Sequence, residues 1–486
     1  MAGIGCLRLY PTWQSGSLKT HGLIDASMNY SWDSRMEPFL PGKLPQPCWE
    51  LGKIGMDDAA LSMKNPFALA AAPGSWQRTL YILFFAQLMV AVGFSSIFPF
   101  LPLYVEHLGS TSGLGVEILA GLVYSAQSFT MMLASPFWGA LADRYGRKLM
   151  VGRSMFGGAI ILLTMAFVTS AEQLVALRAI QGLVTGTVAA ANALLASVTP
   201  RQKTGYAMGM LQVGFGSGLA FGPLVGGAVA DLYGYNTVFF LTAAMLTLAG
   251  VMVAFGVEEK FDPHQGKERR RSPLLAEWGN TLAIPGVLVT FLMRFSTSLG
   301  RMMIVPIIPL FIQTLLVDLS RLNTLTGLVQ GIASGATTLS AVFLGRLGDR
   351  IGYRKVLVTC MALLGGAYAL QGFVTSWWQL LILQAMCGVA MGGVIPIISA
   401  LLANYVRAGG EGSVFGMDNS INAAGRAAAP LLGAAVATGW GYPAAFYSAA
   451  LIMVAASLLA AWRLPPSRPS VEAAIAVVKE GAKEEV

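Results

Sequence analysis

The sequence carries little charge for its length. Of its 486 residues, 12% are charged and 55% are hydrophobic, whereas a soluble domain has about 25% charged residues. This composition excludes an ordinary soluble protein and indicates one that lies in a lipid bilayer. The formal net charge is +8. Because the basic residues lie in short segments between apolar runs, this excess indicates membrane topology and not nucleic-acid binding.

Residue types that catalyse reactions or hold metals are also scarce. The three histidines, His21, His107 and His264, lie outside every long apolar run, so none is available for a proton relay within the membrane. The four cysteines show no metal-binding spacing and imply no disulfide framework. There is no phosphate-binding Gly-x-x-x-x-Gly-Lys-Ser/Thr loop, no HExxH and no nucleophile elbow. We therefore expect no enzyme, no metal, no cofactor and no ATP-driven pump.

What the sequence does contain is a series of long apolar runs. A helix needs about 20 apolar residues to cross a bilayer. Twelve such runs lie near residues 79–104, 117–139, 149–169, 173–196, 205–230, 236–256, 284–315, 323–345, 355–375, 377–403, 412–437 and 442–462. The sequence thus predicts an all-α integral membrane protein with twelve transmembrane helices.

Positive charge alternates between the segments that connect these runs. On one side the only Lys or Arg is Arg321. The other side holds Arg144, Arg147, Lys148, Arg153, Arg201, Lys203, Lys260, Lys267, Arg269, Arg270, Arg271, Arg346, Arg350, Arg354 and Lys355. The positive-inside rule places the basic segments in the cytoplasm. We expect a multi-pass membrane protein with both termini in the cytoplasm.

The chain also repeats itself at an offset of 206 to 207 residues. Pro99 and Pro102 match Pro306 and Pro309, and Gly209, Gly218 and Gly226 match Gly416, Gly425 and Gly433. Two six-helix halves that hold a substrate between them at mid-depth are the architecture of alternating access. The expected domains are a disordered extension or over-long start at 1–76, halves at 77–256 and 284–463, a cytoplasmic linker at 257–283 and a cytoplasmic tail at 464–486.

One pattern of glycine and charge occurs in both halves, after the second and the eighth run. Asp143 would face the N-terminus of the eleventh run and Asp349 that of the fifth, where the helix dipole favours an anion. Such contacts would latch the halves on the cytoplasmic side; alternatively, the charges only anchor loops at the membrane surface. The predicted gate comprises Gly139, Asp143, Arg144, Gly146, Arg147, Lys148, Gly345, Asp349, Arg350 and Gly352.

The first of these segments, Gly-x-Leu-x-Asp-Arg-x-Gly-Arg-Lys at 139–148, resembles signature motif A of the major facilitator superfamily. Residues 178–182, Arg-Ala-Ile-Gln-Gly, are similar to motif B, and residues 218–227 are similar to the antiporter motif C. The resemblance covers residues 76 to 463 and points to the twelve-span drug:proton antiporter branch. It implies the major facilitator fold, two pseudo-symmetric halves, a coupling role for Arg178 and a place in the plasma membrane, the inner membrane of a bacterium.

The motif C helix has a physical interpretation of its own. Gly214, Gly218, Gly222 and Gly226 recur every four residues and form a small-residue stripe that permits close helix packing, while Pro223 invites a bend. The resemblance implies a hinge and a seal against leakage, and both interpretations can hold together. The predicted hinge residues are Gly218, Gly222, Pro223, Gly226 and Gly227.

Charged residues within the runs are costly and are therefore functional candidates. Asp418 is the only clear acid; it would carry the coupled proton, or else form a fixed ion pair with a neighbouring basic residue. Arg178 would take part in coupling or hydrogen-bond nearby carbonyls. Arg294 and Arg301 lie seven residues apart on one helical face and would line a cavity or form structural pairs. The predicted substrate-cavity residues are Gln87, Phe94, Asn192, Gln212, Arg294, Arg301, Asn419, Asn422 and Arg426.

These features together predict a secondary active efflux transporter. It would export small amphiphilic drugs or toxic metabolites in exchange for protons, as a monomer surrounded by membrane lipid and without nucleic acid. Many proton-coupled exporters carry an acid in the first span, whereas this chain has none between Tyr81 and Val105. Two alternatives are an exporter of one specific sugar or metabolite and a non-transporting membrane sensor with the same fold.

Overall fold

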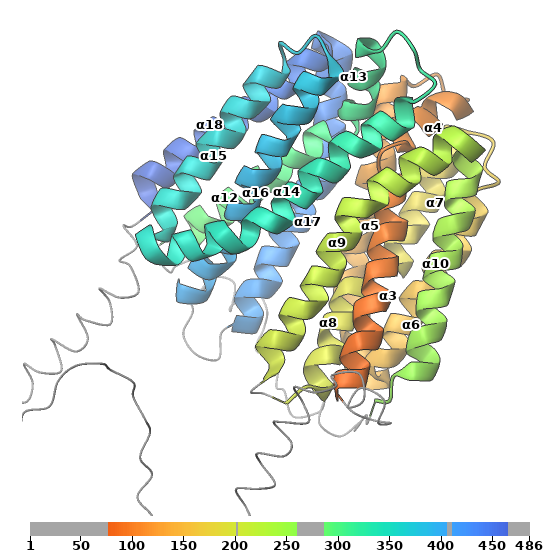
Figure 1. Ribbon diagram of the computed structural model, residues 1–486, viewed down its shortest axis with the longest axis vertical. Coiled ribbons are helices and arrows are strands. Elements are labelled where there is room, and N and C mark those ends of the chain that lie inside the picture. The colour runs from red at the N-terminus through yellow and green to blue at the C-terminus, as the bar shows by residue number, and fades with distance from the viewer. Residues whose placement is uncertain (1–75, 201–202, 260–285, 406–410, 465–486) are drawn as a thin grey trace, which may run out of the picture. The chain divides into compact units, whose positions relative to one another are not determined.

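The computed structural model describes residues 76–200, 203–259, 286–405 and 411–464, and within these ranges it contains helices and no β-strand (Figure 1). The all-α class predicted from the apolar runs is confirmed. Nearly all of the predicted extension, most of the predicted linker and nearly all of the predicted tail lie outside the described residues.

The helices follow the two repeats along the chain. Those of the first half, orange to yellow-green in Figure 1, are α3 (Trp76–Ile97), α4 (Leu101–Leu108), α5 (Val116–Tyr145), α6 (Arg147–Met165), α7 (Ala171–Val184), α8 (Thr187–Val198), α9 (Thr204–Tyr233) and α10 (Tyr235–Gly256). Those of the second half, green to blue, are α12 (Val287–Ile304), α13 (Ile307–Leu315), α14 (Leu322–Ile351), α15 (Tyr353–Gln371), α16 (Trp377–Tyr405), α17 (Glu411–Trp440) and α18 (Tyr442–Arg463).

Three of the predicted spans are interrupted. The breaks between α3 and α4 and between α12 and α13 lie at Pro99 and Pro306, which are equivalent in the repeat, because proline lacks the N–H that continues a helix. The run near 173–196 forms α7 and α8 instead of one helix. Gly186, between them, has φ +146°, a conformation that side-chain-bearing residues rarely adopt.

Nine helical stretches within the described residues are long and apolar enough to cross a membrane. Three of the twelve predicted spans are not among them, for reasons visible in the sequence. The run near 173–196 is divided between two short helices. The run near 355–375 begins in a helix with Arg354 and Lys355 in its first turn, and the run near 412–437 carries Asp418 and Arg426.

Each half has its own apolar core. One cluster of buried side chains lies within residues 80–257, and a second lies within 287–464 with Leu103 added from the first half. Because lipid tails are as apolar as these side chains, close van der Waals packing, and not removal from water, holds such clusters together within a bilayer. Separate cores let each half hold its shape if it moves against the other.

The halves meet through two equivalent helix pairs, α9 with α14 and α5 with α17. We call the end of the helices at which Arg147, Lys203 and Lys355 lie the basic end, and the other the opposite end. Gly227 near the end of α9 faces Asn323 at the start of α14, and Gly121 near the start of α5 faces Pro430 in α17. Both of these contacts lie toward the opposite end.

Candidate functional site

A carboxylate joins the two halves at the opposite end. Asp231, in the last turn of α9, accepts hydrogen bonds from the backbone N–H groups of Asn323 and Thr324 at 3.2 and 2.8 Å. It also accepts from the Asn323 amide at 2.8 Å and the Thr324 hydroxyl at 2.6 Å. The first N–H groups of a helix have no partner within it and carry partial positive charge. Asp231 therefore caps a helix of the other half, and we call this contact the Asp231 clasp.

Glycines allow the backbones of the halves to approach at the same end. A Cβ atom on Gly227 would clash with the carbonyl oxygen of Asn323, and one on Gly327 would clash with that of Pro223. A Cβ on Gly121 would lie 2.8 Å from the carbonyl oxygen of Pro430. These contacts extend to the middle of α9, where Gly216 faces Thr338 of α14.

Toward the basic end, the same helices have no close neighbours beside their glycines among the described residues. A Cβ on Gly209 of α9, Gly345 of α14 or Gly416 of α17 would meet no described atom within 4 Å. Gly209 and Gly416 are equivalent in the two repeats. The described contacts between the halves are therefore concentrated at the opposite end.

The predicted gate at the basic end makes contacts within each half. Gly146 and Gly352, with φ of +96° and +98°, form equivalent turns between consecutive helices. The backbone N–H groups of Arg147 and Lys148 donate to the carboxylate of Glu259 at 3.0 and 2.8 Å, and the Arg147 guanidinium donates to the Ala193 carbonyl.

Of the two aspartates of the predicted latch, the structure describes the side chain of Asp349 but not that of Asp143. Asp349 is exposed and accepts a 2.6 Å hydrogen bond from the Tyr353 hydroxyl of its own half. Arg350 is also exposed. The side chains of Asp143 and Arg144 lie outside the part of the chain that the structure describes, so the latch stays a prediction.

Asp418 forms a bidentate ion pair with Arg294. The Arg294 Nε lies 2.9 and 3.0 Å from the two carboxylate oxygens, and its Nη2 lies 2.6 Å from Oδ2. The Asp418 side chain is 6% exposed and the Arg294 side chain is 13% exposed. A paired geometry offsets much of the cost of removing two charges from water. This is the ion pair that the sequence left open as the alternative role of Asp418.

Arg178 is fixed between two helices of the first half. Its Nη1 donates to the side-chain oxygens of Gln127 on α5 and Gln181 on α7 at 2.9 and 3.1 Å, and the residue is 2% exposed. Its Nε and Nη2 have no hydrogen-bond partner among the described residues. The motif B arginine thus holds a buried positive charge with neutral partners.

The motif C glycines line the contact of α9 with α3. Cβ atoms on Gly218, Gly222 and Gly226 would clash with successive residues of α3 from Leu88 to Ser96. Gly214 continues the stripe against Phe84, as the spacing predicts. Helix α9 runs without interruption through Pro223, whose carbonyl oxygen faces Gly327 of the other half.

The remaining predicted cavity residues do not form one cluster of mutual contacts. Gln87 is buried, and neither of its amide atoms has a partner within the described residues. Phe94 packs near Gly158, and Asn422 accepts a hydrogen bond from Ser298. Asn192 is partly buried, whereas Gln212 and Asn419 are exposed.

Arg301 lies in a polar cavity inside the second half. The cavity has a volume of about 80 Å³ and is surrounded by α12, α13, α14, α15 and α16. Its polar lining comes from Arg301, Gln330, Ser334, Thr337, Tyr368 and Gln384. The Nε2 of Gln330 is buried without a hydrogen-bond partner in the described part of the chain.

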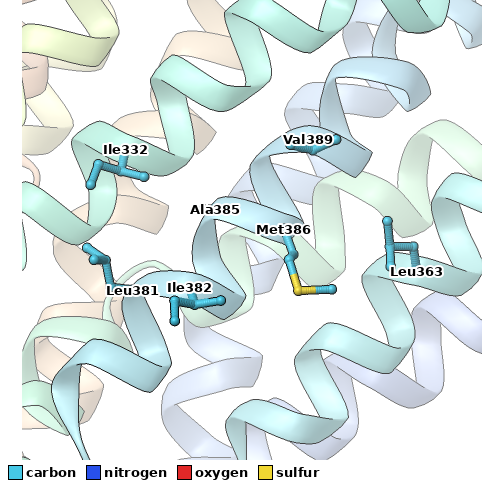
Figure 2. A pocket seen from close by; sticks show the side chains of 7 residues that line it. All are labelled: Ile332, Leu363, Leu381, Ile382, Ala385, Met386 and Val389. Carbon is cyan, nitrogen blue, oxygen red and sulfur yellow. The ribbon is translucent and has the colours of Figure 1, made fainter.

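A second hollow is lined by side chains of α14, α15 and α16. Figure 2 shows its apolar side chains, among them Ile332 of α14, Leu363 of α15 and Met386 of α16. The hollow has a volume of about 360 Å³ and contains none of the predicted site residues. Ile382 and Val389 on its wall are 52% and 42% exposed, as expected of side chains that face lipid.

The polar contacts that join the halves at the opposite end were not predicted from the sequence. Besides the Asp231 clasp, the Tyr442 hydroxyl donates to Glu117 at 3.1 Å, and the Gln313 amide donates to Glu106 at 3.4 Å. The last contact could have been predicted from the repeat, because Glu106 and Gln313 are 207 residues apart and so occupy equivalent positions. The others join positions that are not equivalent, and only the packing of the halves brings them together.

Comparison with known proteins agrees with this architecture. The chain matches the Major Facilitator Superfamily over residues 83–316 and 290–483. It is 36% identical over 400 residues to the multidrug resistance protein MdtG of Serratia proteamaculans (strain 568), covering 82% of this chain and 96% of that protein. It is 37% identical over 375 residues to MdtG of Citrobacter koseri, with 77% and 92% covered.

Solved structures show the same fold at lower sequence identity. The human organic anion transporter MFSD10 has a TM-score of 0.57 and 20% identity, with 79% of this chain and 99% of that chain covered. A bacterial homologue of the human lysosomal transporter Spinster, in an inward-facing and occupied conformation, has a TM-score of 0.68 and 13% identity, with 80% and 97% covered. The helices, the repeat and these matches agree, and the chain belongs to the Major Facilitator Superfamily.

Proposed function

We propose that this chain is a secondary active efflux transporter that exports small amphiphilic drugs or toxic metabolites by alternating access. The observation that carries the proposal is the one-sided contact between the halves. They are joined at the opposite end by the Asp231 clasp and by close glycine contacts, while toward the basic end no atom in the described ranges lies close to Gly209, Gly345 or Gly416. The MdtG relatives, named for multidrug resistance, support export of drugs.

The positive-inside rule assigns the basic end to the cytoplasm. With that orientation, the described conformation takes up substrate from the cytoplasm and the Asp231 clasp closes the external side. Release outside then requires the clasp to open and the halves to meet at the basic end. In that second conformation Asp143 and Asp349 take up their latch positions against the helices of the other half.

Proton influx supplies the driving force in this proposal. Asp418 is the acid assigned to the proton, and protonation would break its ion pair with Arg294. When Asp418 is protonated, Arg294 has no carboxylate partner. The net charge of the pair between α12 and α17 thus becomes positive at one step of the transport cycle. Arg178, with neutral partners only, is assigned to coupling in the first half.

Everted membrane vesicles test the proposal. Vesicles energised to be acidic inside are given a panel of amphiphilic dyes, and wild type is compared with Asp418→Asn and Arg178→Ala. We expect the wild type to accumulate dye and an uncoupler to abolish the accumulation. Dye accumulation that is unchanged by the uncoupler contradicts proton antiport. Transport of a single sugar or metabolite favours a specific exporter, and no transport over the whole panel favours a sensor.

A further inference from the structure

The Arg301 cavity is a small polar space inside the second half. Its volume is about 80 Å³, and Arg301 is the one charged residue among the described residues that line it. Arg301 lies 14 residues after Val287, the first residue of α12, which is about 21 Å along the helix axis. A polar cavity of this volume holds a few water molecules, because water satisfies the polar groups of its wall. A hydrated space with one fixed positive charge therefore lies deep within the membrane.

One face of α12 connects this cavity to the ion pair of Asp418. Arg294, Ser298 and Arg301 are spaced four and three residues apart, so they lie on the same face. Across the contact with α17, the Ser298 hydroxyl donates to Asn422 and Arg294 pairs with Asp418. Polar groups thus continue from Arg301 to a carboxylate about two helical turns nearer the basic end.

The cavity lies on the side of Asp418 that faces the opposite end. Ile304, Val305 and Ile308 of its wall flank the break between α12 and α13. The positive-inside rule makes that end external, and protons flow inward from it in the proposed antiport. A proton that crossed the cavity at the wrong stage of the cycle would reach Asp418 and dissipate the gradient without export of substrate.

An arginine also lies inside the first half, but on a different helix. At the repeat offset of 206, Gln384 on the cavity wall is equivalent to Arg178, and at the offset of 207, Arg301 is equivalent to Phe94. The first half thus combines an arginine on α7 with a phenylalanine on α3. The second half combines a glutamine on α16 with an arginine on α12. This exchange of positions favours a role for the positive charge over a role for one particular side-chain contact.

We propose that Arg301 is a charge barrier that keeps protons from crossing this cavity to Asp418. A fixed positive charge in a low-dielectric environment repels hydronium, as an arginine does in selective membrane pores. A guanidinium suits this task because it stays protonated inside a protein. The described wall of the cavity holds no carboxylate that would cancel the charge. The inference rests on the proton antiport proposed above, because a barrier is needed where a proton gradient drives transport.

Passive proton entry into liposomes tests the barrier. Full-length protein is reconstituted with pyranine inside, and a pH step is applied without substrate, with valinomycin and potassium to balance charge. We expect Arg301→Phe and Arg301→Gln to raise protein-dependent proton entry about tenfold, since a unit charge acts on a proton with that strength at about 10 Å. Arg301→Lys keeps the charge and should stay close to wild type. Arg463→Gln, which removes an exposed arginine at the end of α18, is the control for net charge.

Moving the charge to the neighbouring helix separates the charge from the side chain that carries it. The double variant Arg301→Phe with Gln384→Arg copies the arrangement of the first half, and it should return proton entry to the wild-type rate. Adding Asp418→Asn to Arg301→Phe should also stop the leak, because the acid at the end of the path is lost. A disturbed fold would not be corrected by a second substitution, and thermal unfolding of each variant monitors it.

Three results overturn the inference. They are wild-type proton entry in both Arg301→Phe and Arg301→Gln, a leak that Gln384→Arg does not lower, and a leak that persists with Asp418→Asn. Failure of the transport proposal looks different. In that case the wild type accumulates no dye in energised vesicles, while the leak of Arg301→Phe and its reversal by Gln384→Arg remain.

Discussion

Glu106 and Gln313 occupy the same position in the two repeats and contact each other across the halves. The Nε2 of Gln313 donates to Oε1 of Glu106 at 3.4 Å, and the two residues are 207 positions apart. Equivalent positions can meet only close to the axis that relates the halves. The pseudo-twofold axis thus passes between α4 and α13, and the contacts of the opposite end are arranged around it. Tyr235 and Tyr442, also 207 apart, are another equivalent pair at this end.

The Asp231 clasp is predicted to set the balance between the two conformations. Asp231→Asn removes the charge and Asp231→Ala removes all four hydrogen bonds. Because charge-assisted hydrogen bonds contribute about 1.5–3 kcal/mol and this site is partly exposed, we expect a shift of about 1–2 kcal/mol toward the conformation open at the opposite end. Spin labels on both sides of the α9–α14 contact measure the shift as longer distances. Glu258→Gln, a carboxylate remote from this contact, is the control, and an unchanged distance distribution in Asp231→Ala would show that the clasp does not hold this end.

Two neighbouring glycines of α9 are predicted to act differently. Gly226 faces Ser96 of its own half, whereas Gly227 faces Asn323 of the other half. Gly227→Ala should hinder closure of the halves while leaving each half folded, because the halves can separate to accommodate the methyl group. Gly226→Ala should lower the unfolding temperature, since the α3–α9 contact is part of one core and cannot open. Accessibility of cysteines at the opposite end, measured beside thermal unfolding, distinguishes the two. The same response in both variants would contradict the assignment of Gly227 to the interface.

The sequence predicted the helices and the repeat because both depend on local patterns. Apolar runs, prolines and recurring glycines are visible one segment at a time, and the stripe from Gly214 to Gly226 lies against α3 as its spacing requires. The division of the run near 173–196 was missed, because the conformation of Gly186 is set by its surroundings and not by the apolar pattern.

The candidate site was predictable in its residue types and less so in its pairings. Scarcity of charge singled out Arg294, Arg301, Asp418 and Arg426, but which arginine meets Asp418 depends on the register of α12 and α17. The Asp231 clasp lay beyond prediction for a related reason. An aspartate at a helix end is ordinary in a sequence, and only packing shows that it caps α14.

Glu172, in the first turn of α7, is predicted to hold the loop between α4 and α5 in place over a wide pH range. Its carboxylate accepts hydrogen bonds from Ser112, Thr111 and Ser110, and those from Ser112 above all hold its pKa well below the usual range. A lowered pKa stabilises the fold above the ordinary pKa of a glutamate, about 4.3, and this contribution is lost as the pH falls toward the folded value. The protection of residues 110–112 from hydrogen exchange, measured relative to the intrinsic exchange rate at each pH, should therefore be the same at pH 7 and pH 5. Glu172→Gln should exchange faster at both, and a wild type that loses protection between pH 7 and pH 5 would contradict this account.

The Arg294–Asp418 pair allows its structural role to be separated from proton coupling. Asp418→Asn alone leaves a mostly buried arginine without its partner and should destabilise the protein by about 3–5 kcal/mol. The double variant Arg294→Gln with Asp418→Asn removes both charges and should recover most of that loss, as measured by unfolding in detergent. If Asp418 carries the proton, the double variant is stable but the proton gradient no longer drives accumulation of dye. Downhill flux of the same dye persists. Full proton-driven accumulation by the double variant would assign the pair a structural role alone, and coupling would then have to reside elsewhere in the chain.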